Sequence, residues 1–208
     1  MNLPNKLTVS RFVLTGFFLW AVFSRSAVND TIALVLFGVA SFTDFLDGKI
    51  ARSRNLITNF GALMDPLADK ILTCSAFIAL VERHMITPPD SLFHLGNFYV
   101  RPKVEAWMVV IIVARELAIT GLRLLAASKN VVLAAERYGK HKTISQIAAI
   151  IALLVMDASV EWWPWLRDLF SPWTPWFALA TLWLTVILTL ASGAIYLWRN
   201  RAIYLADV

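Results

Sequence analysis

Four aspartates lie close together at the junction of two strongly apolar stretches, in the segment DFLDGKIARSRNLITNFGALMDPLADK (residues 44–70). Spacings of three and four residues return to the same side of a helix, so a helical segment presents these acids in pairs. The two faces carry Asp44, Asp47, Gly48, Ala51 and Arg52 in the first half, and Gly61, Asp65 and Asp69 in the second. The sequence therefore predicts two helices that each present a pair of carboxylates.

The chemistry that suits four neighbouring carboxylates best is the binding of divalent cations. A charged aspartate at the centre of a membrane helix costs roughly 2.5–3.5 kcal/mol, and four such charges repel one another. Mg²⁺ and Mn²⁺ prefer hard oxygen ligands and leave room for substrate phosphates, so we expect these ions, two per site. The forked, permanently charged Arg52 suits a phosphate. The small residues Gly48, Ala51 and Gly61 let a nucleotide or a facing helix come close.

These residues resemble a known family. All eight fixed positions of the pattern D-x2-D-G-x2-A-R-x8-G-x3-D-x3-D are present, and the pattern is similar to that of the CDP-alcohol phosphotransferases. The resemblance implies a membrane enzyme that transfers a phosphatidyl group from CDP-diacylglycerol to an alcohol and releases CMP. It also implies that the aspartates hold the metal ions, that Gly48 and Arg52 border the nucleotide, and that Asp69 takes the proton from the acceptor hydroxyl. The competing interpretation is that the acids only form ion pairs with nearby bases, namely Lys49, Arg52, Arg54 and Lys70.

The composition places the chain in a membrane. Of its 208 residues 59% are hydrophobic, above the roughly 45–50% that is usual for soluble domains. Six spans of ~20 residues account for most of this length, so we expect a single domain over residues 1–208. The basic residues behind the net charge of +5 flank apolar runs, which favours membrane lipids and phosphate ligands over nucleic acid as partners.

The expected fold class is all-α, a polytopic bundle of six transmembrane helices with a short interfacial segment at the N-terminus. The spans are predicted at about residues 7–24, 31–52, 60–81, 104–127, 143–160 and 176–198. The polar, proline-containing segment 82–103 and the Trp-rich segment 161–175 are expected to be external connections.

The N-terminal residues NLPNKLTVSR resemble the start of the phosphatidylglycerophosphate synthases within the family. This resemblance implies that Asn5, Thr8 and Arg11 border the nucleotide. An alternative of equal weight applies to Arg11, whose long side chain could snorkel to the lipid headgroups.

Three charged residues occur inside the fourth predicted span: Arg115, Glu116 and Arg123. Ionisable residues within a bilayer mark a functional site by default. Because a guanidinium needs an anion wherever it is buried, Arg115 and Arg123, two turns apart on one side, are expected to face an anionic substrate. Glu116 keeps two interpretations, a site residue or an internal partner of arginine that ties helices together.

The fifth span is preceded by GKHKT, in which Lys140, Lys142 and Thr143 can point into the bundle from a helix start. Together with the two arginines, these residues predict a site for an acceptor that carries a phosphate. The segments VIIVARELAITGLR and GKHKTISQ resemble the phosphatidylglycerophosphate synthases, which implies sn-glycerol 3-phosphate as the acceptor. Inositol phosphate is the nearest alternative, and serine and phosphatidylglycerol are weaker ones.

Lysines and arginines gather on the side of the membrane that carries the aspartates, and such residues favour the cytoplasm. We therefore expect an integral protein of a bacterial inner membrane, with the active site and both termini cytoplasmic. The oligomeric state is left open, a homodimer included. An ion or proton transporter could also bury acids at mid-span. That rival predicts discontinuous helices and related halves, whereas the four aspartates cluster in one pair of helices.

Overall fold

The structure is a computed structural model that describes residues 3–24, 28–54, 59–86, 93–95, 98–100, 102–129 and 138–205. Within these ranges the side chains of a smaller set lie outside the description: residues 3–8, 44–54, 59–66, 69, 84–86, 93–95, 98–100, 138–140 and 205.

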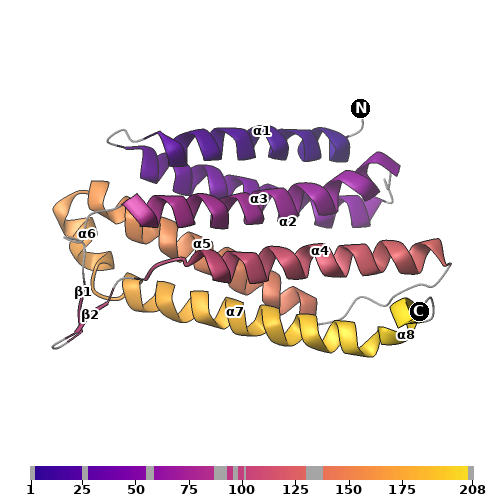
Figure 1. Ribbon diagram of the computed structural model, residues 1–208. Helices are drawn as coiled ribbons and strands as arrows, with labels where there is room; N and C mark the ends of the chain where they lie inside the picture. Colours follow the sequence, from indigo (N-terminus) through magenta and orange to yellow (C-terminus); the bar gives the residue numbers. More distant parts are fainter. Residues whose placement is uncertain are drawn as a thin grey trace.

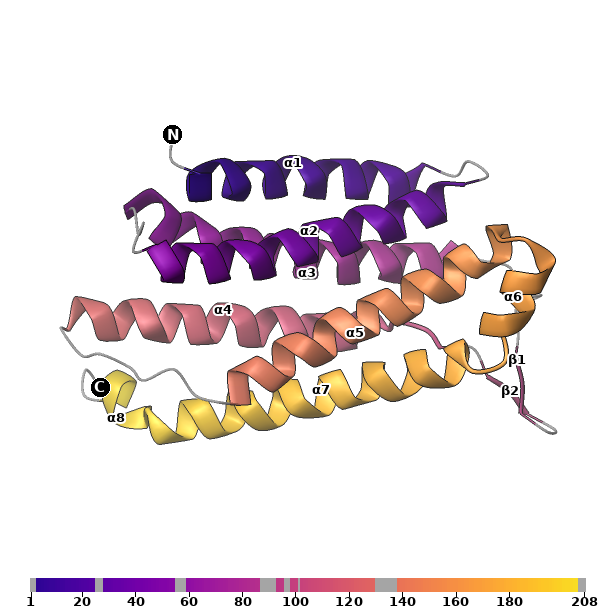
Figure 2. The same cartoon turned by 180° about the vertical axis from the view of Figure 1, so that it is seen from behind.

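Long helices make up a bundle (Figures 1 and 2). They are α1 (Leu3–Phe23), α2 (Asn29–Arg54), α3 (Asn59–Ile86), α4 (Ala106–Ser128), α5 (Tyr138–Ala158) and α7 (Thr174–Arg199). The shorter elements are β1 (Phe93–Leu95), β2 (Phe98–Val100), the 3₁₀ helix η2 (Ser159–Glu161), α6 (Pro164–Phe170) and α8 (Arg201–Leu205). The two strands pair in antiparallel fashion, with His94 opposite Tyr99.

The long helices run along a common direction, and both chain termini lie at one end of the bundle (Figures 1 and 2). This end, with the last turns of α2 and α4 and the first turn of α3, is named the terminal end. The other end carries α6 and the β1–β2 hairpin and is named the hairpin end.

Helix α5 is the central helix, because it packs against α2, α3 and α7. Its residues Ile150 and Leu153 are fully buried. Beside it, Phe18 of α1 and Phe37 of α2 meet with their ring centroids 5.6 Å apart. Large apolar side chains also cover the outside of the bundle, among them Trp20, Val35, Ile78, Leu117 and Ile187. A helix that is apolar on its outer face as well as its inner face is typical of a membrane protein.

Two stretches of the described chain are long and apolar enough to cross a membrane, His141–Glu161 and Thr174–Arg199. Two shorter apolar helical stretches cover Val9–Phe23 and Asn29–Thr43. Helix α4 is not among the first two, and it carries three charged residues in its apolar sequence. The expectation of a helical bundle is confirmed, with the small hairpin as an addition.

The structure corrects the predicted boundaries at several points. The N-terminal segment is continuous with the first span, because α1 already begins at Leu3, and its place at the membrane interface stays a prediction. Pro4 is compatible with this start, since a first helical turn needs no backbone N–H donor. Helix α5 begins at Tyr138, ahead of the predicted start at 143. The two expected external connections contain the hairpin and α6, and α6 has a proline in its first turn.

Candidate active site

The four aspartates lie on α2 and α3, in the halves of these helices nearer the terminal end (Figure 1). Asp44 precedes Arg54, the last residue of α2, by ten positions, and Asp69 follows Asn59, the first residue of α3, by ten. At ~1.5 Å per residue, the two backbones therefore carry these residues at a similar distance from the helix ends. The aspartate side chains lie outside the described residues.

The chemistry of this donor set fits Mg²⁺ or Mn²⁺, because carboxylate oxygens are hard ligands. Among the side chains that the structure does describe, no group of three or more His, Cys, Asp or Glu is placed to hold a metal ion. Asp44, Asp47, Asp65 and Asp69 thus remain the candidate ligands. Seven more residues of the expected site have side chains outside the described part of the chain: Asn5, Thr8, Gly48, Ala51, Arg52, Gly61 and Lys140.

The described part of the site is a polar cluster around Glu116, which lies in the middle of α4. One carboxylate oxygen, Oε1, accepts hydrogen bonds from Arg115 Nη1 at 3.2 Å and from Lys142 Nζ. Lys142 reaches this oxygen from the first turns of α5. The side chains of Glu116 and Lys142 are only 9% and 5% exposed. The structure therefore brings Arg115 and Lys142 together on a single buried carboxylate.

Lys70 joins this cluster to the helix of the aspartates. Its Nζ donates to the Thr120 hydroxyl, and that hydroxyl donates in turn to the Glu116 carbonyl oxygen at 2.7 Å. Lys70 directly follows Asp69 in the sequence. The contact thus connects the residue after Asp69 to Thr120, which lies one helical turn from Glu116 on α4. We refer to Glu116, Arg115, Lys142, Thr120 and Lys70 as the Glu116 cluster.

Helix α7 fixes the stem of Arg115. The guanidinium Nη2 donates to Ser192 Oγ at 3.4 Å. A Cβ atom added to the neighbouring Gly193 would lie 2.9 Å from Arg115 Cγ, which is too close for any residue but glycine unless the arginine moves. Arg115 Nε is buried and has no hydrogen-bond partner among the described residues. The arginine is therefore held on two sides while one of its donors remains unused there.

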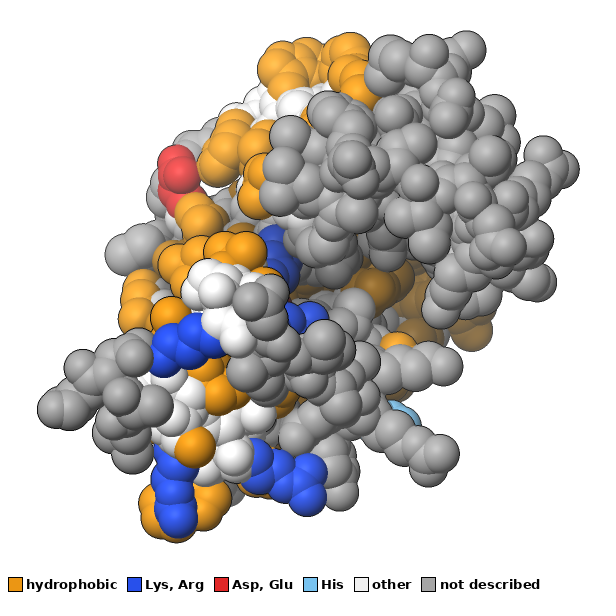
Figure 3. Space-filling view, turned by 90° about the vertical axis from the view of Figure 1, so that its right-hand side faces the viewer, with side chains coloured by type: hydrophobic (Ala, Val, Ile, Leu, Met, Phe, Trp, Pro, Cys, Tyr) orange, Lys and Arg blue, Asp and Glu red, His pale blue; other side chains and the backbone are white. Residues whose placement is uncertain are grey.

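Arg123 lies two turns further along α4 and has a different environment. Its Nε donates to the Tyr196 hydroxyl at 3.3 Å, and its guanidinium lies 5.8 Å from the centre of that ring. The residue is exposed rather than buried. Thr143 is half-buried on α5, next to Lys142. Viewed from the terminal end, Lys and Arg side chains outweigh Asp and Glu among the described residues (Figure 3).

Arg11 is buried inside the protein. The residue is 1% exposed, although it lies on α1 at the edge of the bundle's apolar core. The Thr15 hydroxyl donates to its carbonyl oxygen at 2.8 Å. The interpretation that Arg11 snorkels to the headgroups is therefore wrong. Its predicted place beside the nucleotide stays a prediction.

Sequence reasoning did not assign Thr120, Ser192 or Tyr196 to the site. Each is a polar residue within an apolar helix, and Thr120 follows Glu116 by one turn, as Tyr196 follows Ser192. That spacing was a usable signal, because i,i+4 neighbours share a helix face. Lys70 was considered only as an ion-pair partner of the acids. Its contact with Thr120 depends on how α3 packs on α4, which no local pattern reveals.

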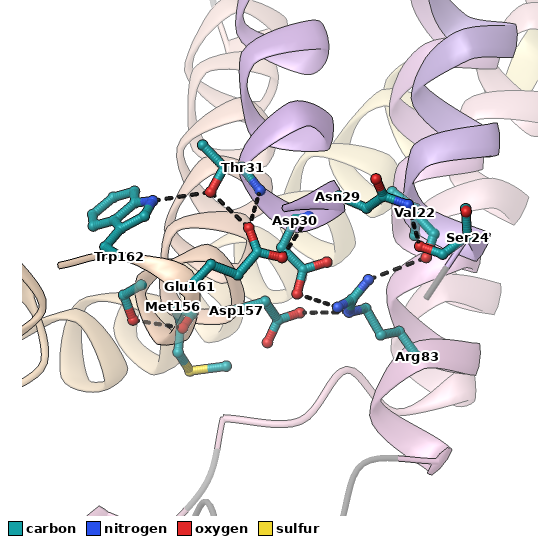
Figure 4. Close-up of polar contacts among 11 residues, drawn as sticks. Val22, Ser24, Asn29, Asp30, Thr31, Arg83, Met156, Asp157, Glu161 and Trp162 are labelled. Carbon is teal, nitrogen blue, oxygen red and sulfur yellow. Dashed lines mark hydrogen bonds and ion pairs between the residues drawn. The ribbon is translucent and has the colours of Figure 1, made fainter. Parts of the chain in front are cut away.

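A second polar network ties the helices together at the hairpin end (Figure 4). Arg83 of α3 pairs with Asp30 of α2 and, at 3.4 Å, with Asp157 of α5. The Glu161 carboxylate accepts hydrogen bonds from the backbone N–H groups of Asp30 and Thr31, at 3.0 and 2.9 Å. Glu161 thus caps the first turn of α2, where backbone donors lack intrahelical partners.

The sequence comparisons identify the family of the chain. The family model described as CDP-alcohol phosphatidyltransferase matches residues 1–191. The chain belongs to this family, and the resemblance seen in its aspartate pattern is confirmed.

Among its curated relatives is a Bacillus subtilis (strain 168) protein that is 39% identical, with 96% of this chain and 95% of the relative covered. Relatives from Rickettsia felis and Shigella flexneri are 32% and 30% identical, with 74% and 97% of this chain covered and 75% and 96% of the relatives. All three are named CDP-diacylglycerol--glycerol-3-phosphate 3-phosphatidyltransferase.

Proposed function

We propose that this chain is a metal-dependent CDP-diacylglycerol--glycerol-3-phosphate 3-phosphatidyltransferase, which makes phosphatidylglycerophosphate and CMP. The observation that carries the proposal is the Glu116 cluster, in which Arg115 and Lys142 share one buried carboxylate beside the helix of Asp69. Family membership supports the phosphatidyl transfer. The names of the relatives support glycerol 3-phosphate as the acceptor.

In this reaction an acceptor hydroxyl oxygen forms a new bond to the phosphatidyl phosphorus, and the bond from that phosphorus to the oxygen of CMP breaks. Asp69 would take the proton that the hydroxyl loses. Gly48, Ala51, Gly61 and Arg52 would border the nucleotide, with Asn5, Thr8 and Arg11 from α1. Mg²⁺ or Mn²⁺ held by the four aspartates would stabilise the charge on the phosphates.

The proposal of a phosphorylated acceptor rests on the cationic side chains of α4 and α5. Arg115, Arg123, Lys140 and Lys142, with Thr143, would hold the phosphate of sn-glycerol 3-phosphate, since guanidinium and ammonium groups bind phosphate oxygens strongly. Serine carries no phosphate and would leave these cations without an anion. Inositol phosphate offers the same charge and is therefore the rival that needs a direct test.

We further propose that the six long helices all cross the membrane as one domain over residues 1–208. They contain between 21 and 28 residues, and at ~1.5 Å per residue even the shortest spans the ~30 Å hydrocarbon core. The exposed apolar side chains on the outside of the bundle support this view. Two of the charges of α4, on Glu116 and Arg115, face other helices, where they meet Lys142 and Ser192.

The orientation with both termini and the aspartates in the cytoplasm is supported by the common end at which N and C lie (Figure 1). The Lys and Arg side chains visible at that end agree with the tendency of basic residues to stay cytoplasmic (Figure 3). The acceptor and the cations would then meet on the side of a bacterial inner membrane where soluble phosphate esters occur.

The test is an acceptor panel with purified protein, CDP-diacylglycerol and Mg²⁺ or Mn²⁺. Glycerol 3-phosphate, inositol phosphate, serine, phosphatidylglycerol and plain glycerol are compared by CMP release and by the lipid formed. We expect turnover with glycerol 3-phosphate to exceed that with every other acceptor, to stop with a chelator, and to return with the metal. Preference for another acceptor would overturn the acceptor assignment, and full turnover without metal would overturn the metal site.

A further inference from the structure

We infer that Glu116 is a positioning residue for the acceptor site, which holds the Arg115 guanidinium and the Lys142 ammonium together so that both act on one phosphate. The inference rests on the proposed function and assigns a role to a residue that the acceptor proposal itself does not use.

The geometry of the carboxylate carries this inference. Both cations donate to the same atom, Glu116 Oε1, from two different helices. Two like charges this close repel each other, and the repulsion is strong where water is excluded. A carboxylate between them removes that repulsion and fixes the distance between α4 and the start of α5. Without it, the two cations would separate.

The rest of the cluster restricts Glu116 and Arg115 further. The Glu116 backbone is tied to Lys70 through Thr120, so α3 moves with it. Arg115 is held on its other side by Ser192 and by the bare backbone of Gly193. Its Nε remains a buried donor without a partner in the described part of the chain. A buried donor left unpaired is unfavourable, so an acceptor oxygen supplied by a ligand would complete the arrangement.

This arrangement explains why an acid belongs in a site for an anion. The Glu116 carboxylate offsets one of the two cationic charges. It also fixes the positions of the Arg115 guanidinium and the Lys142 ammonium before the substrate binds. Preorganised donors bind and discriminate better than mobile ones. The predicted consequence is a loss of affinity for the acceptor, with little change in the handling of CDP-diacylglycerol, when Glu116 loses its charge.

The variant that tests this is Glu116→Gln, which keeps the shape of the side chain and one acceptor oxygen but removes the negative charge. We expect the KM for glycerol 3-phosphate to rise about tenfold or more, as when a charged hydrogen-bond partner is lost. We expect kcat and the KM for CDP-diacylglycerol to change much less. An unchanged KM for glycerol 3-phosphate, in a folded variant, would overturn the inference.

Glu161→Gln is the matched control at the hairpin end, because Glu161 also accepts several hydrogen bonds but lies far from the aspartates along the bundle (Figures 1 and 4). It should lower the thermal unfolding midpoint and leave the KM for glycerol 3-phosphate as in the native protein. An equal rise in KM for both variants would mean that any loosened helix weakens the acceptor site, which would also overturn the inference.

A double variant decides whether Glu116 acts through Lys142, and it covers the case in which Glu116→Gln does not fold. Glu116→Gln with Lys142→Met removes both partners and leaves no buried ammonium beside a neutral amide. Because Glu116 still holds Arg115 in the Lys142→Met protein, the KM of the double variant for glycerol 3-phosphate should exceed that of Lys142→Met by clearly less than tenfold. A further rise of tenfold or more would show that Glu116 acts independently of Lys142, which would overturn the inference. If the native protein does not use glycerol 3-phosphate at all, the proposed function fails instead.

Discussion

Each end of the bundle carries a charged cluster, and the two clusters differ in the composition of their described side chains. At the hairpin end one base, Arg83, lies among the acids Asp30, Asp157 and Glu161 (Figure 4). At the terminal end the described part of the Glu116 cluster has one acid, Glu116, which accepts from Arg115 and Lys142, while the third base, Lys70, contacts Thr120. Both clusters connect α3 to α5, so both contribute to the same helix packing.

The two clusters differ in whether their charged groups find hydrogen-bond partners within the protein. At the hairpin end the additional acid, Glu161, accepts two backbone N–H groups and the Thr31 hydroxyl. The Glu161 carboxylate is therefore satisfied by the protein itself. In the Glu116 cluster Arg115 Nε is a buried donor that has no acceptor among the described residues. An acceptor that the protein supplies is suited to stability, whereas a buried guanidinium donor left without one is suited to an anionic ligand.

The largest difference between the two ends is expected when one carboxylate at each end is replaced by an amide. Asp69→Asn should lower turnover by roughly 10²-fold or more, because the proposed base is lost. Asp157→Asn should keep turnover within about twofold, since it removes only an ion-pair partner of Arg83. Steady-state rates on both purified variants check this, and similar losses in the two would reject the division between a catalytic and a structural end.

Within the terminal end, Asp44→Asn separates a metal ligand from the base. We expect it to weaken the binding of CDP or CMP in calorimetry, whereas Asp69→Asn should bind these nucleotides nearly as well as the native protein. Equal losses of nucleotide binding would mean that both aspartates act mainly as ligands.

The next effect concerns Arg123. Removal of a charged hydrogen-bond partner costs about 1.5–3 kcal/mol, so Arg123→Ala should lower kcat/KM for glycerol 3-phosphate roughly 10- to 150-fold. Plain glycerol has no phosphate, so its already low kcat/KM should hardly change. Arg201→Ala is the control, since Arg201 also stacks on an aromatic ring, Trp198, at 4.5 Å. Equal losses for both acceptors would indicate that Arg123 supports the fold.

The helices of the fold could be predicted from the sequence because apolar runs of this length have few alternatives. The aspartate helices and the cations of α4 and α5 could be assigned as well, since their spacing and motifs are local. The contact of Glu116 with Lys142 could not be predicted, because helical spacing shows which residues share a face but not which neighbouring helix packs against that face. The contact of Lys70 with Thr120 was missed for the same reason.

At the hairpin end the expected effect is on stability. Arg83→Met leaves Asp30 and Asp157 without this partner, and breaking a buried pair costs on the order of 3 kcal/mol. The thermal unfolding midpoint should fall clearly, whereas turnover well below that midpoint should stay near the native value. Arg167→Met is the control, because Arg167 is exposed on α6 and surface changes of this kind stay within about 0.5 kcal/mol. A large loss of turnover in folded Arg83→Met would remove the contrast between the ends.

The smallest effect is expected at Gly193. It tests whether the packing of the Arg115 side chain against α7 affects the use of the acceptor. An added methyl group would lie 2.9 Å from Arg115 Cγ, so Gly193→Ala must push the arginine away from α7. We expect kcat/KM for glycerol 3-phosphate to fall severalfold with fold and CDP-diacylglycerol binding retained. Gly121→Ala on α4 meets nothing within 4 Å, and alanine should stabilise that helix by roughly 0.5–1 kcal/mol without a kinetic change. If the two alanine variants behave alike, the position of the Arg115 stem does not control acceptor use.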